Sequence, residues 1–444
     1  MGVDRDRWGQ EVTAADPAAV ERLDGAILAY CGMRTDIGER MKSVFEADPE
    51  MPMALVAKTA FLKLFATAKM DAAAATTLEA LQARLADGEA TARERAHAAS
   101  MARWIAGDME AACRGWEAIA IEWPRDLFAL KLAQYLRFYL GDADGMRGGI
   151  ARALYAWDEE TPGYGYLAGS YAFALEEAGA YEEAERFGRR AVALDAADVW
   201  AAHAVAHVME MQGRAEEGLA WLDGLSGGWD GVHNFKHHAH WHRALFALDL
   251  GRLDQALAIY DADVWTEAAG DYLDLSNAAS LLWRLEQEGV DVGERWTPIA
   301  DLSAERVGEH ALVFATCHFA MALAADDRRD DLDRLEAAQD AHVGGAADAF
   351  AQVWGAVGRA LVAAIEAARA GAPGEAVDLL LPVRERIVRL GGSHAQRDVF
   401  ERLLLEAALA DGRVSLARAL LSERLQRRPG ERYAESRLAA LPGA

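Results

Sequence analysis

The sequence predicts an all-α protein, built as an α-solenoid of stacked helix pairs. Glycines recur along the chain at alternating spacings of 34 and 38 residues, and each lies between two segments with helical patterning. A small residue follows most of these glycines five positions later. The glycines are Gly107, Gly141, Gly179, Gly213 and Gly251, and the small residues are Ala112, Ala184, Gly218 and Ala256. A repeat of this length, with a turn glycine and a small residue in the second helix, is typical of a helix-turn-helix pair.

The repeats continue toward the C-terminus, with Gly289, Gly371 and Gly412 in the turns and Ala376 and Ala417 in register with the last two. One helix pair cannot bury its apolar face alone, so neighbouring pairs stack and their inner surface becomes the default binding surface. We therefore predict a right-handed superhelix. About eight such pairs complete close to one turn, which would nearly close the superhelix on itself.

The chain is predicted to contain an N-terminal helical cap over residues 1–98 and a single continuous solenoid over residues 99–444. The cap should hold a helix over Ala18–Cys31, and the prolines within residues 48–52 should then break helix. Two later prolines lie at the same repeat position, twelve residues beyond the small residue, and indicate where second helices end. These are Pro124 and Pro429.

Composition and charge favour some partners and exclude others. Hydrophobic residues make up 52% of the chain, and the formal net charge is −25. A surface this acidic repels phosphate backbones and anionic lipid headgroups, so we expect neither nucleic acid nor membrane as a partner. The three cysteines are far apart and odd in number, and the N-terminus has no apolar run of signal-peptide type, which predicts a cytoplasmic protein.

The candidate chemistry lies in the histidines, because seven of the twelve fall between residues 203 and 242. On a helix, residues at i, i+4 and i+7 share one face, so His203, His207 and Glu210 should project together. In the next repeat, the groove-facing region holds His238, Trp241 and His242. First helices of adjacent repeats lie about 10 Å apart, so these imidazoles are predicted to meet in one pocket. The preceding repeat contributes Tyr166, Phe173 and Glu176.

Each histidine also has a structural interpretation, since a single histidine on an apolar helix face is usually a hydrogen-bonded core residue. His233, His237 and His240 form a separate helix face that we expect to be solvated. His318 interrupts an apolar helical run, where it must either bond a partner or line a cavity.

A second candidate element begins at Gly391-Gly392-Ser393. Ser393 can cap a helix that carries His394, Arg397 and Asp398, and a helix start with arginine and histidine can hold an anion. The alternative is a structural cap, with Arg397 in a salt bridge elsewhere. In the first case, this segment would form an anion-binding wall opposite the imidazoles.

The repeat length, the small residue at the helix crossing and the proline position resemble tetratricopeptide repeats in divergent form. Four stretches further resemble the tetratricopeptide repeat protein 38 family. They are HAVAHVMEM at 203–211, HAHWHRAL at 238–245, LLWRLEQEGVDVGERW at 281–296 and GGSHAQRDVF at 391–400. The resemblance implies the helical-repeat fold, but it supplies no reaction.

Two classes of function follow. In the first, the concave face is a small-molecule pocket, in which His203, His207, Glu210, His238 and His242 act as acids, bases or metal ligands on an anionic molecule. A hydrolase is one such enzyme, and Tyr166, Trp241, His318, His394, Arg397 and Asp398 would bind its substrate. In the second, the groove binds a peptide or protein, and the chain is a scaffold without catalysis.

The cofactor is left open by the sequence. Two histidines and a carboxylate form an acceptable set for a divalent metal ion, but histidine pairs can equally work without metal. No Walker loop or dinucleotide-binding glycine turn is present, so the sequence gives no support for a nucleotide.

Overall fold

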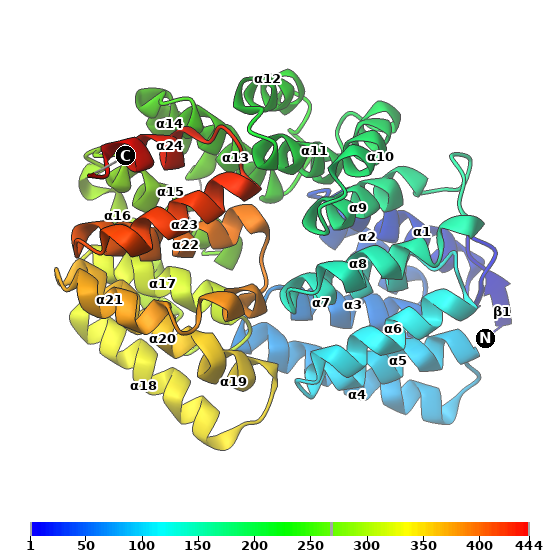
Figure 1. Ribbon diagram of the computed structural model, residues 1–444. Helices are drawn as coiled ribbons and strands as arrows, with labels where there is room; N and C mark the ends of the chain where they lie inside the picture. Colours follow the sequence, from blue (N-terminus) through cyan, green and yellow to red (C-terminus); the bar gives the residue numbers. More distant parts are fainter. Residues whose placement is uncertain (1, 267–269, 443–444) are drawn as a thin grey trace. The chain divides into compact units, whose positions relative to one another are not determined.

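The computed structural model describes residues 2–266 and 270–442, which are almost entirely helical (Figure 1). The strands within these residues form one antiparallel hairpin, β1 (Gly2–Arg5) paired with β2 (Glu11–Ala14). No sheet of three or more strands occurs in the described part of the chain. The predicted all-α fold class is therefore confirmed.

The chain divides into two compact units, and the division falls inside one helix. Unit 1 comprises Met1–Val205 and Gly228–His233, and unit 2 comprises Ala206–Gly227 and Asn234–Ala444. Each unit has its own apolar core. The predicted change from a cap to a solenoid near residue 98 is a different division, based on repeat character, and stays a prediction.

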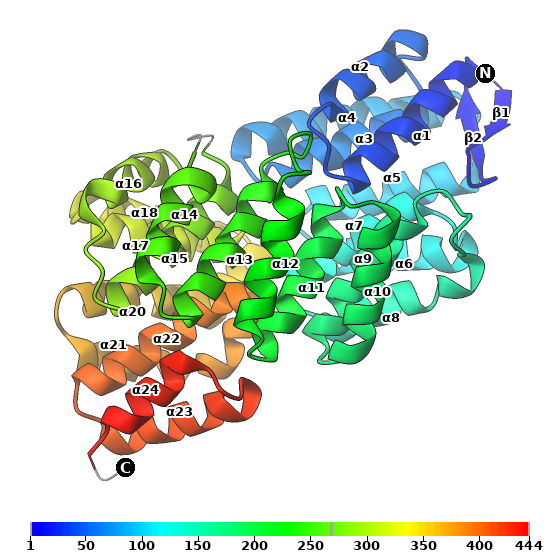
Figure 2. The same ribbon diagram turned by 90° about the horizontal axis from the view of Figure 1, so that it is seen from above.

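Unit 1 consists of the β-hairpin followed by helices that succeed one another with short turns. They are α1 (Pro17–Cys31), α2 (Ile37–Ala47), α3 (Pro52–Leu64), α4 (Ala68–Asp87), α5 (Ala92–Ile105), α6 (Met109–Glu122), α7 (Leu127–Tyr139), α8 (Ala143–Ala151), η1 (Leu154–Ala156), α9 (Tyr164–Glu177), α10 (Tyr181–Leu194) and the first part of α11 (Val199–Met211). Helices α3 and α4, α5 and α6, and α9 and α10 pack as consecutive pairs (Figure 2).

Unit 2 begins with the second part of α11 and continues in the same manner. Its further elements are α12 (Ala215–Ser226), α13 (Phe235–Asp249), α14 (Leu253–Ile259), the π-helical η2 (Tyr260–Val264), α15 (Tyr272–Gln287), η3 (Gly293–Arg295), α16 (Trp296–Glu305), α17 (Val313–Ala325), α18 (Arg329–Gly345), α19 (Ala349–Val353), the π-helical η4 (Trp354–Gly358), α20 (Arg359–Arg369), α21 (Pro373–Leu380), η5 (Arg384–Leu390), α22 (His394–Ala410), α23 (Val414–Arg427) and α24 (Arg432–Ala440). Helices α20 and α21 and helices α22 and α23 are packed pairs.

The turn glycines adopt the conformation that the repeat requires. All eight glycines of the predicted register have positive φ angles, between 68° and 85°. Glycine reaches this left-handed region without the strain that a Cβ atom causes, so it lets one helix end and the next begin. The handedness and the closure of the stack stay predictions.

The small residues of the register lie where helices cross. Ala112, Ala256 and Ala417 are fully buried. A Cβ atom added at Gly218 would come within 2.2 Å of the Phe246 ring. The small side chain is therefore required for close helix packing. In the described residues, no helix is both long enough and apolar enough to cross a membrane.

Candidate functional site

A buried group of histidines lies in unit 2, on helices α11 and α13. His207 comes from α11, whereas His238 and His242 lie one turn apart on α13 and so share a face of that helix. The exposed fractions of the three side chains are 1%, 2% and 0%. We call His207, His238 and His242 the histidine centre.

The rings of the histidine centre are close enough to act together. The ring centroids of His207 and His242 are 4.5 Å apart, and those of His238 and His242 are 5.0 Å apart. One nitrogen from each residue lies within 4.8 Å of the corresponding nitrogens of the other two. A tetrahedral zinc ion with bonds of about 2.05 Å would separate its nitrogen ligands by about 3.3 Å, and nitrogens at most 4.8 Å apart approach this spacing.

Hydrogen bonds fix the orientation of two of these rings. The Nδ1 atom of His242 is 3.1 Å from Oε2 of Glu210, and Nδ1 of His238 is 2.8 Å from Oδ1 of Asn277. A carboxylate and an amide oxygen only accept hydrogen bonds, so Nδ1 is the donor in both rings. Each Nε2 then carries the lone pair that binds a metal ion or takes up a proton.

Burial keeps all three imidazoles neutral at pH 7. It lowers the pKa of His238 to about 3, with a further contribution from His242, and lowers the pKa of His242 to about 3, with a further contribution from Arg284. Burial and the neighbouring His242 also hold the pKa of His207 well below its usual value. Neutral imidazoles are suited to be metal ligands, whereas a pKa of about 3 makes them weak bases and leaves almost no protonated form to act as a general acid at pH 7.

The histidine centre continues into a buried network of opposite charges. Glu210, which orients His242, accepts from Nη1 of Arg428 at 3.3 Å. Nη2 of Arg428 lies 3.8 Å from Oδ1 of Asp398, and Nη1 of Arg424 lies 2.5 Å from the same oxygen. The residue that follows α23 therefore contacts α11, although Glu210 and Arg428 are 218 residues apart.

Asp398 is the centre of this network and contacts two further arginines. Its Oδ2 atom lies 3.6 Å from Nη2 of Arg284 and 3.5 Å from Nε of Arg402. Burial would raise the pKa of Asp398, but the surrounding arginines, Arg424 first among them, hold it well below its usual value. The network thus has four buried guanidinium groups, and its buried carboxylates are those of Asp398, Glu210 and Glu431. Asp249 on α13 also interacts electrostatically with Arg402 and Arg428, and burial raises its pKa to about 7.

Two polar groups in this region have hydrogen-bond donors that are not paired with an acceptor. Nη1 of Arg402 and Nδ2 of Asn277 are buried and have no hydrogen-bond partner among the residues that the structure describes. Arg402 stacks on Tyr433, with its guanidinium carbon 3.7 Å from the ring centroid. Buried donors without an acceptor are costly, so both groups are available to an oxygen-rich ligand.

The structure brings most of the predicted catalytic residues together. His207, Glu210, His238 and His242 converge within unit 2, as described above. His203 lies one turn before His207 on α11, on the unit 1 side of the division, where its ring stacks on Phe173 at 5.4 Å. The part that His203 plays in the site stays a prediction.

The predicted substrate-binding residues differ in their surroundings. Trp241 stacks on His238 at 5.2 Å and donates to the hydroxyl of Ser280. His318 donates through Nδ1 to the carbonyl of Phe314 in its own helix, so it bonds a partner, which was one of the two alternatives. Tyr166, in unit 1, donates to Asp195.

The segment that follows Gly391 forms the predicted helix cap. Ser393 accepts from the backbone of Gln396, and the side chain of Gln396 accepts from the backbone of Ser393, which is a complete capping box. Arg397 donates to the carbonyl of Gly392 and lies 3.3 Å from Nδ1 of His394. Asp398, rather than Arg397, joins the network with Glu210. A ligand-binding role for His394 and Arg397 stays a prediction.

Sequence reasoning missed the arginines of the network and Asn277. Arg284 donates to the carbonyl of Ala395, 111 residues away, and no local spacing indicates that contact. The sequence did contain one indication that these residues matter, because Arg284 and Asp398 both lie in stretches that carry the family resemblance.

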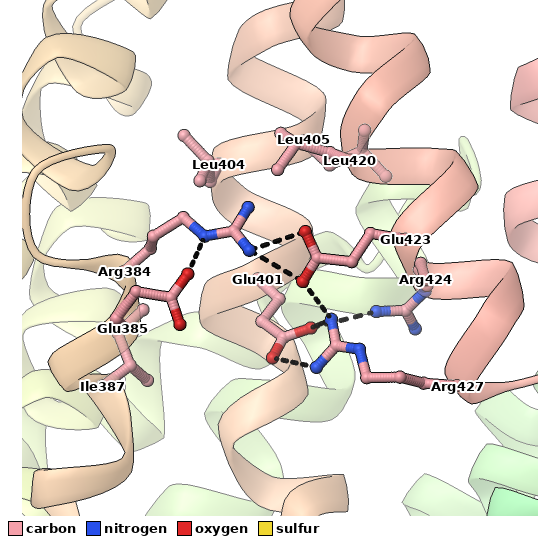
Figure 3. A pocket seen from close by; sticks show the side chains of 10 residues that line it. All are labelled: Arg384, Glu385, Ile387, Glu401, Leu404, Leu405, Leu420, Glu423, Arg424 and Arg427. Carbon is pink, nitrogen blue, oxygen red and sulfur yellow. Dashed lines mark hydrogen bonds and ion pairs between the residues drawn. The ribbon is translucent and has the colours of Figure 1, made fainter.

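A separate hollow in unit 2 is lined by charged residues that pair with one another (Figure 3). It lies between η5, α22 and α23, and Arg384 donates to both carboxylate oxygens of Glu423 while Arg427 pairs with Glu401. Because these charges neutralise each other, the hollow indicates no particular ligand.

Comparisons with known proteins bear on the fold. No family model matches the chain. It is similar to the crystal structure of yeast Tom70, with a TM-score of 0.36 and 14% identity, over 94% of this chain and 87% of that chain. It is also similar to a structure of Naa15/Naa10 bound to HypK-THB, with a TM-score of 0.25 and 13% identity, over 95% of this chain and 65% of that chain.

The class of fold follows from three observations, which are the helix pairs, the turn glycines and the buried small residues. The chain is a tetratricopeptide-repeat-like helical protein. Because both TM-scores lie below 0.5 and both identities below 25%, the similarities identify neither an activity nor a partner.

Proposed function

We propose that this protein binds a divalent metal ion through His207, His238 and His242 and uses it to hydrolyse a small anionic molecule. The observation that carries the proposal is the group of buried rings with ligand nitrogens within 4.8 Å of one another, in which Glu210 and Asn277 accept from Nδ1 of His242 and His238 and leave each Nε2 lone pair for a metal ion. Metal-binding histidines typically donate their other ring proton to a carboxylate or carbonyl oxygen in this way.

The donor set fits a borderline transition metal ion. Three neutral imidazoles with one open position form a known type of catalytic zinc site, whereas magnesium and calcium prefer oxygen ligands. When bound, such an ion polarises a coordinated water or substrate oxygen. Glu210 would hold His242 in the required tautomer and lower the net charge of the occupied site.

The arginines around the site support an anionic substrate. Four arginines are buried in this network, and Arg402 and Asn277 each have a donor available for a ligand oxygen. Arg428 links the network to the histidine centre through Glu210. A carboxylate or phosphate group would accept from such a donor.

The alternative is a peptide-binding scaffold, which the fold class alone would suggest. The burial of the three histidines argues against it, because side chains that are at most 2% exposed cannot line an open peptide groove. We also infer that the chain is a divergent relative of the tetratricopeptide repeat protein 38 family, on the four stretches quoted above.

Metal content tests the proposal directly. We expect elemental analysis of the purified protein, after exhaustive dialysis against metal-free buffer, to give close to one equivalent of a transition metal ion. Substitution of that ion by Co²⁺ should give the visible absorption bands of a nitrogen-ligated cobalt site. A protein that contains no metal and takes up neither Zn²⁺ nor Co²⁺ would refute the metal-dependent function and favour the scaffold.

Glu210→Gln should weaken metal binding while leaving the three ligands in place. Glutamine can still accept from His242, but it lacks the negative charge that strengthens the imidazole as a ligand. We expect metal affinity to fall by about 10- to 100-fold, measured by competition with a chelator. Glu288→Gln is the matched control, because Glu288 pairs with Arg432 and Arg437 away from the histidines. An equal loss in both variants would contradict a specific role for Glu210.

A further inference from the structure

Unit 1 contains a lysine in an unusual environment. Of the six lysines in the sequence, Lys131 on α7 is the only one with a buried side chain, at 4% exposure. Its amine donates to the hydroxyl of Ser170, at 3.2 Å. It also lies over two aromatic rings, 4.3 Å from the ring centroid of Trp200 and 5.0 Å from that of Tyr135.

The amine of Lys131 has no carboxylate to balance its charge. Within the described residues, Nζ of Lys131 forms no ion pair with an aspartate or glutamate, although Asp198 interacts with it electrostatically. A buried ammonium group without an ion pair is costly, so burial lowers the pKa of Lys131, although the charges of Cys31 and Asp198 oppose the change. A larger fraction of the amine is then neutral and nucleophilic.

A carboxyl group with a raised pKa belongs to the same neighbourhood. Asp198 caps the start of α11 by accepting from the backbone of Ala201 through Oδ1, whereas its buried Oδ2 has no partner among the described residues. Burial raises the pKa of Asp198 to about 7. Oδ2 of Asp198 lies close to Gly169, because a Cβ atom built on that glycine would be 3.3 Å from it. The next residue, Ser170, accepts from Lys131, so Asp198 and Lys131 contact neighbouring residues of α9.

Gln134 adds a second polar atom without a partner. Its Nε2 atom donates to the carbonyl of Ser170 at 2.5 Å, but its buried Oε1 atom has no hydrogen-bond partner in the described part of the chain. Lys131, Gln134 and Asp198 therefore all reach the turn of α9 at residues 169–170. An amide oxygen and a carboxyl oxygen without partners beside a buried amine indicate a polar ligand, because Gln134 would accept a hydrogen bond from it and the carboxyl group of Asp198 would donate one when protonated.

We propose that Lys131 forms an imine with a small aldehyde or ketone, and that Asp198 is the acid for this step. The nitrogen lone pair attacks the carbonyl carbon, and a proton moves from nitrogen to the former carbonyl oxygen to give a carbinolamine. Asp198 then donates its proton to the hydroxyl group, which leaves as water, and the nitrogen lone pair forms the carbon–nitrogen double bond, giving a protonated imine and the Asp198 carboxylate. The aromatic rings of Trp200 and Tyr135 exclude bulk water, which would hydrolyse the imine. This site is independent of the histidine centre.

Reductive trapping tests the proposal on the full chain. The protein is incubated with acetaldehyde and cyanoborohydride at pH 6.5, and the ethylated lysines are identified by peptide mass spectrometry. We expect Lys131 to be modified well ahead of the other five lysines, because an ordinary lysine has a pKa of about 10.4 and is almost fully protonated at that pH. Modification of the exposed lysines with none at Lys131 would overturn the proposal.

The pH dependence and a variant test the roles of the two residues. Between pH 9 and pH 6.5, trapping at exposed lysines should fall about tenfold per pH unit, whereas trapping at Lys131 should fall less steeply because its pKa is lowered. Asp198→Asn should slow trapping at Lys131 by about a hundredfold at pH 6.5, as expected for the loss of a general acid. Lys131→Arg keeps the positive charge over the rings and should fold normally without being labelled. An unchanged trapping rate in Asp198→Asn would remove Asp198 from the proposal, and parallel pH profiles would refute the neutral amine.

Discussion

Metal binding is expected to be lost in the His242→Ala variant. This residue lies between the other two members of the histidine centre, with its ring 4.5 Å from that of His207 and 5.0 Å from that of His238. Removing it leaves two imidazoles on different helices, which is too few for a tight site. The loss of affinity should therefore exceed the upper value of about 100-fold expected for an outer partner such as Glu210.

The measurement is metal content after dialysis, together with titration by Co²⁺. His318→Ala is the matched control, because His318 is also a fully buried imidazole in unit 2 but bonds only within its own helix. Both variants lose a buried ring, so both should lose some stability. Only His242→Ala should lose the metal ion. If both variants retain one equivalent of metal, His242 is not a ligand, and the same pair of measurements on His203→Ala tests whether that residue belongs to the site.

The parts of the site that could be predicted from the sequence are the local ones. Spacing on a single helix placed His238 and His242 on one face, and the glycine register correctly aligned α11 with α13. These relations depend only on helix geometry and on repeat length. The capping box at Ser393 is local in the same sense, because its hydrogen bonds span three residues.

The parts that could not be predicted depend on contacts between distant segments. Arg428 reaches Glu210 across 218 residues, and nothing in the sequence around either residue indicates the pairing. The ligand-binding role of Arg397 stays a prediction, and the contact that its guanidinium makes with Gly392 is a local one at its own helix start. Lys131 gave no signal at all, because a single lysine in an apolar helix normally extends to solvent rather than lying beneath aromatic rings.

Asp398→Asn is expected to lower the free energy of unfolding by about 3–5 kcal/mol at pH 7. Four buried guanidinium groups lie around this carboxylate, at distances from 2.5 Å for Arg424 to 3.8 Å for Arg428. Asparagine has nearly the same shape, so it leaves no cavity, but it removes the negative charge. The arginines then remain buried with too few counter-charges, which is the costly way to break a buried ion pair.

Chemical denaturation followed by circular dichroism measures this loss. The control is Asp411→Asn, because Asp411 pairs with Arg413 at 2.7 Å in a partly exposed position, where an ion pair contributes about 0–1 kcal/mol. A similarly small change for Asp398→Asn would mean that the arginine network does not depend on this charge.

The pH dependence gives a second, independent check on Asp398. Its pKa in the folded protein is held well below the unfolded value of about 3.9, so its charge stabilises the fold fully above about pH 5. This stabilisation is lost as the pH falls through the folded-state pKa, because the unfolded chain takes up the proton first. The difference in unfolding free energy between wild type and Asp398→Asn should therefore stay constant from pH 7 to pH 5 and shrink below about pH 4. A difference that persisted unchanged at pH 3 would show that the substitution acts through shape or hydrogen bonding rather than through charge.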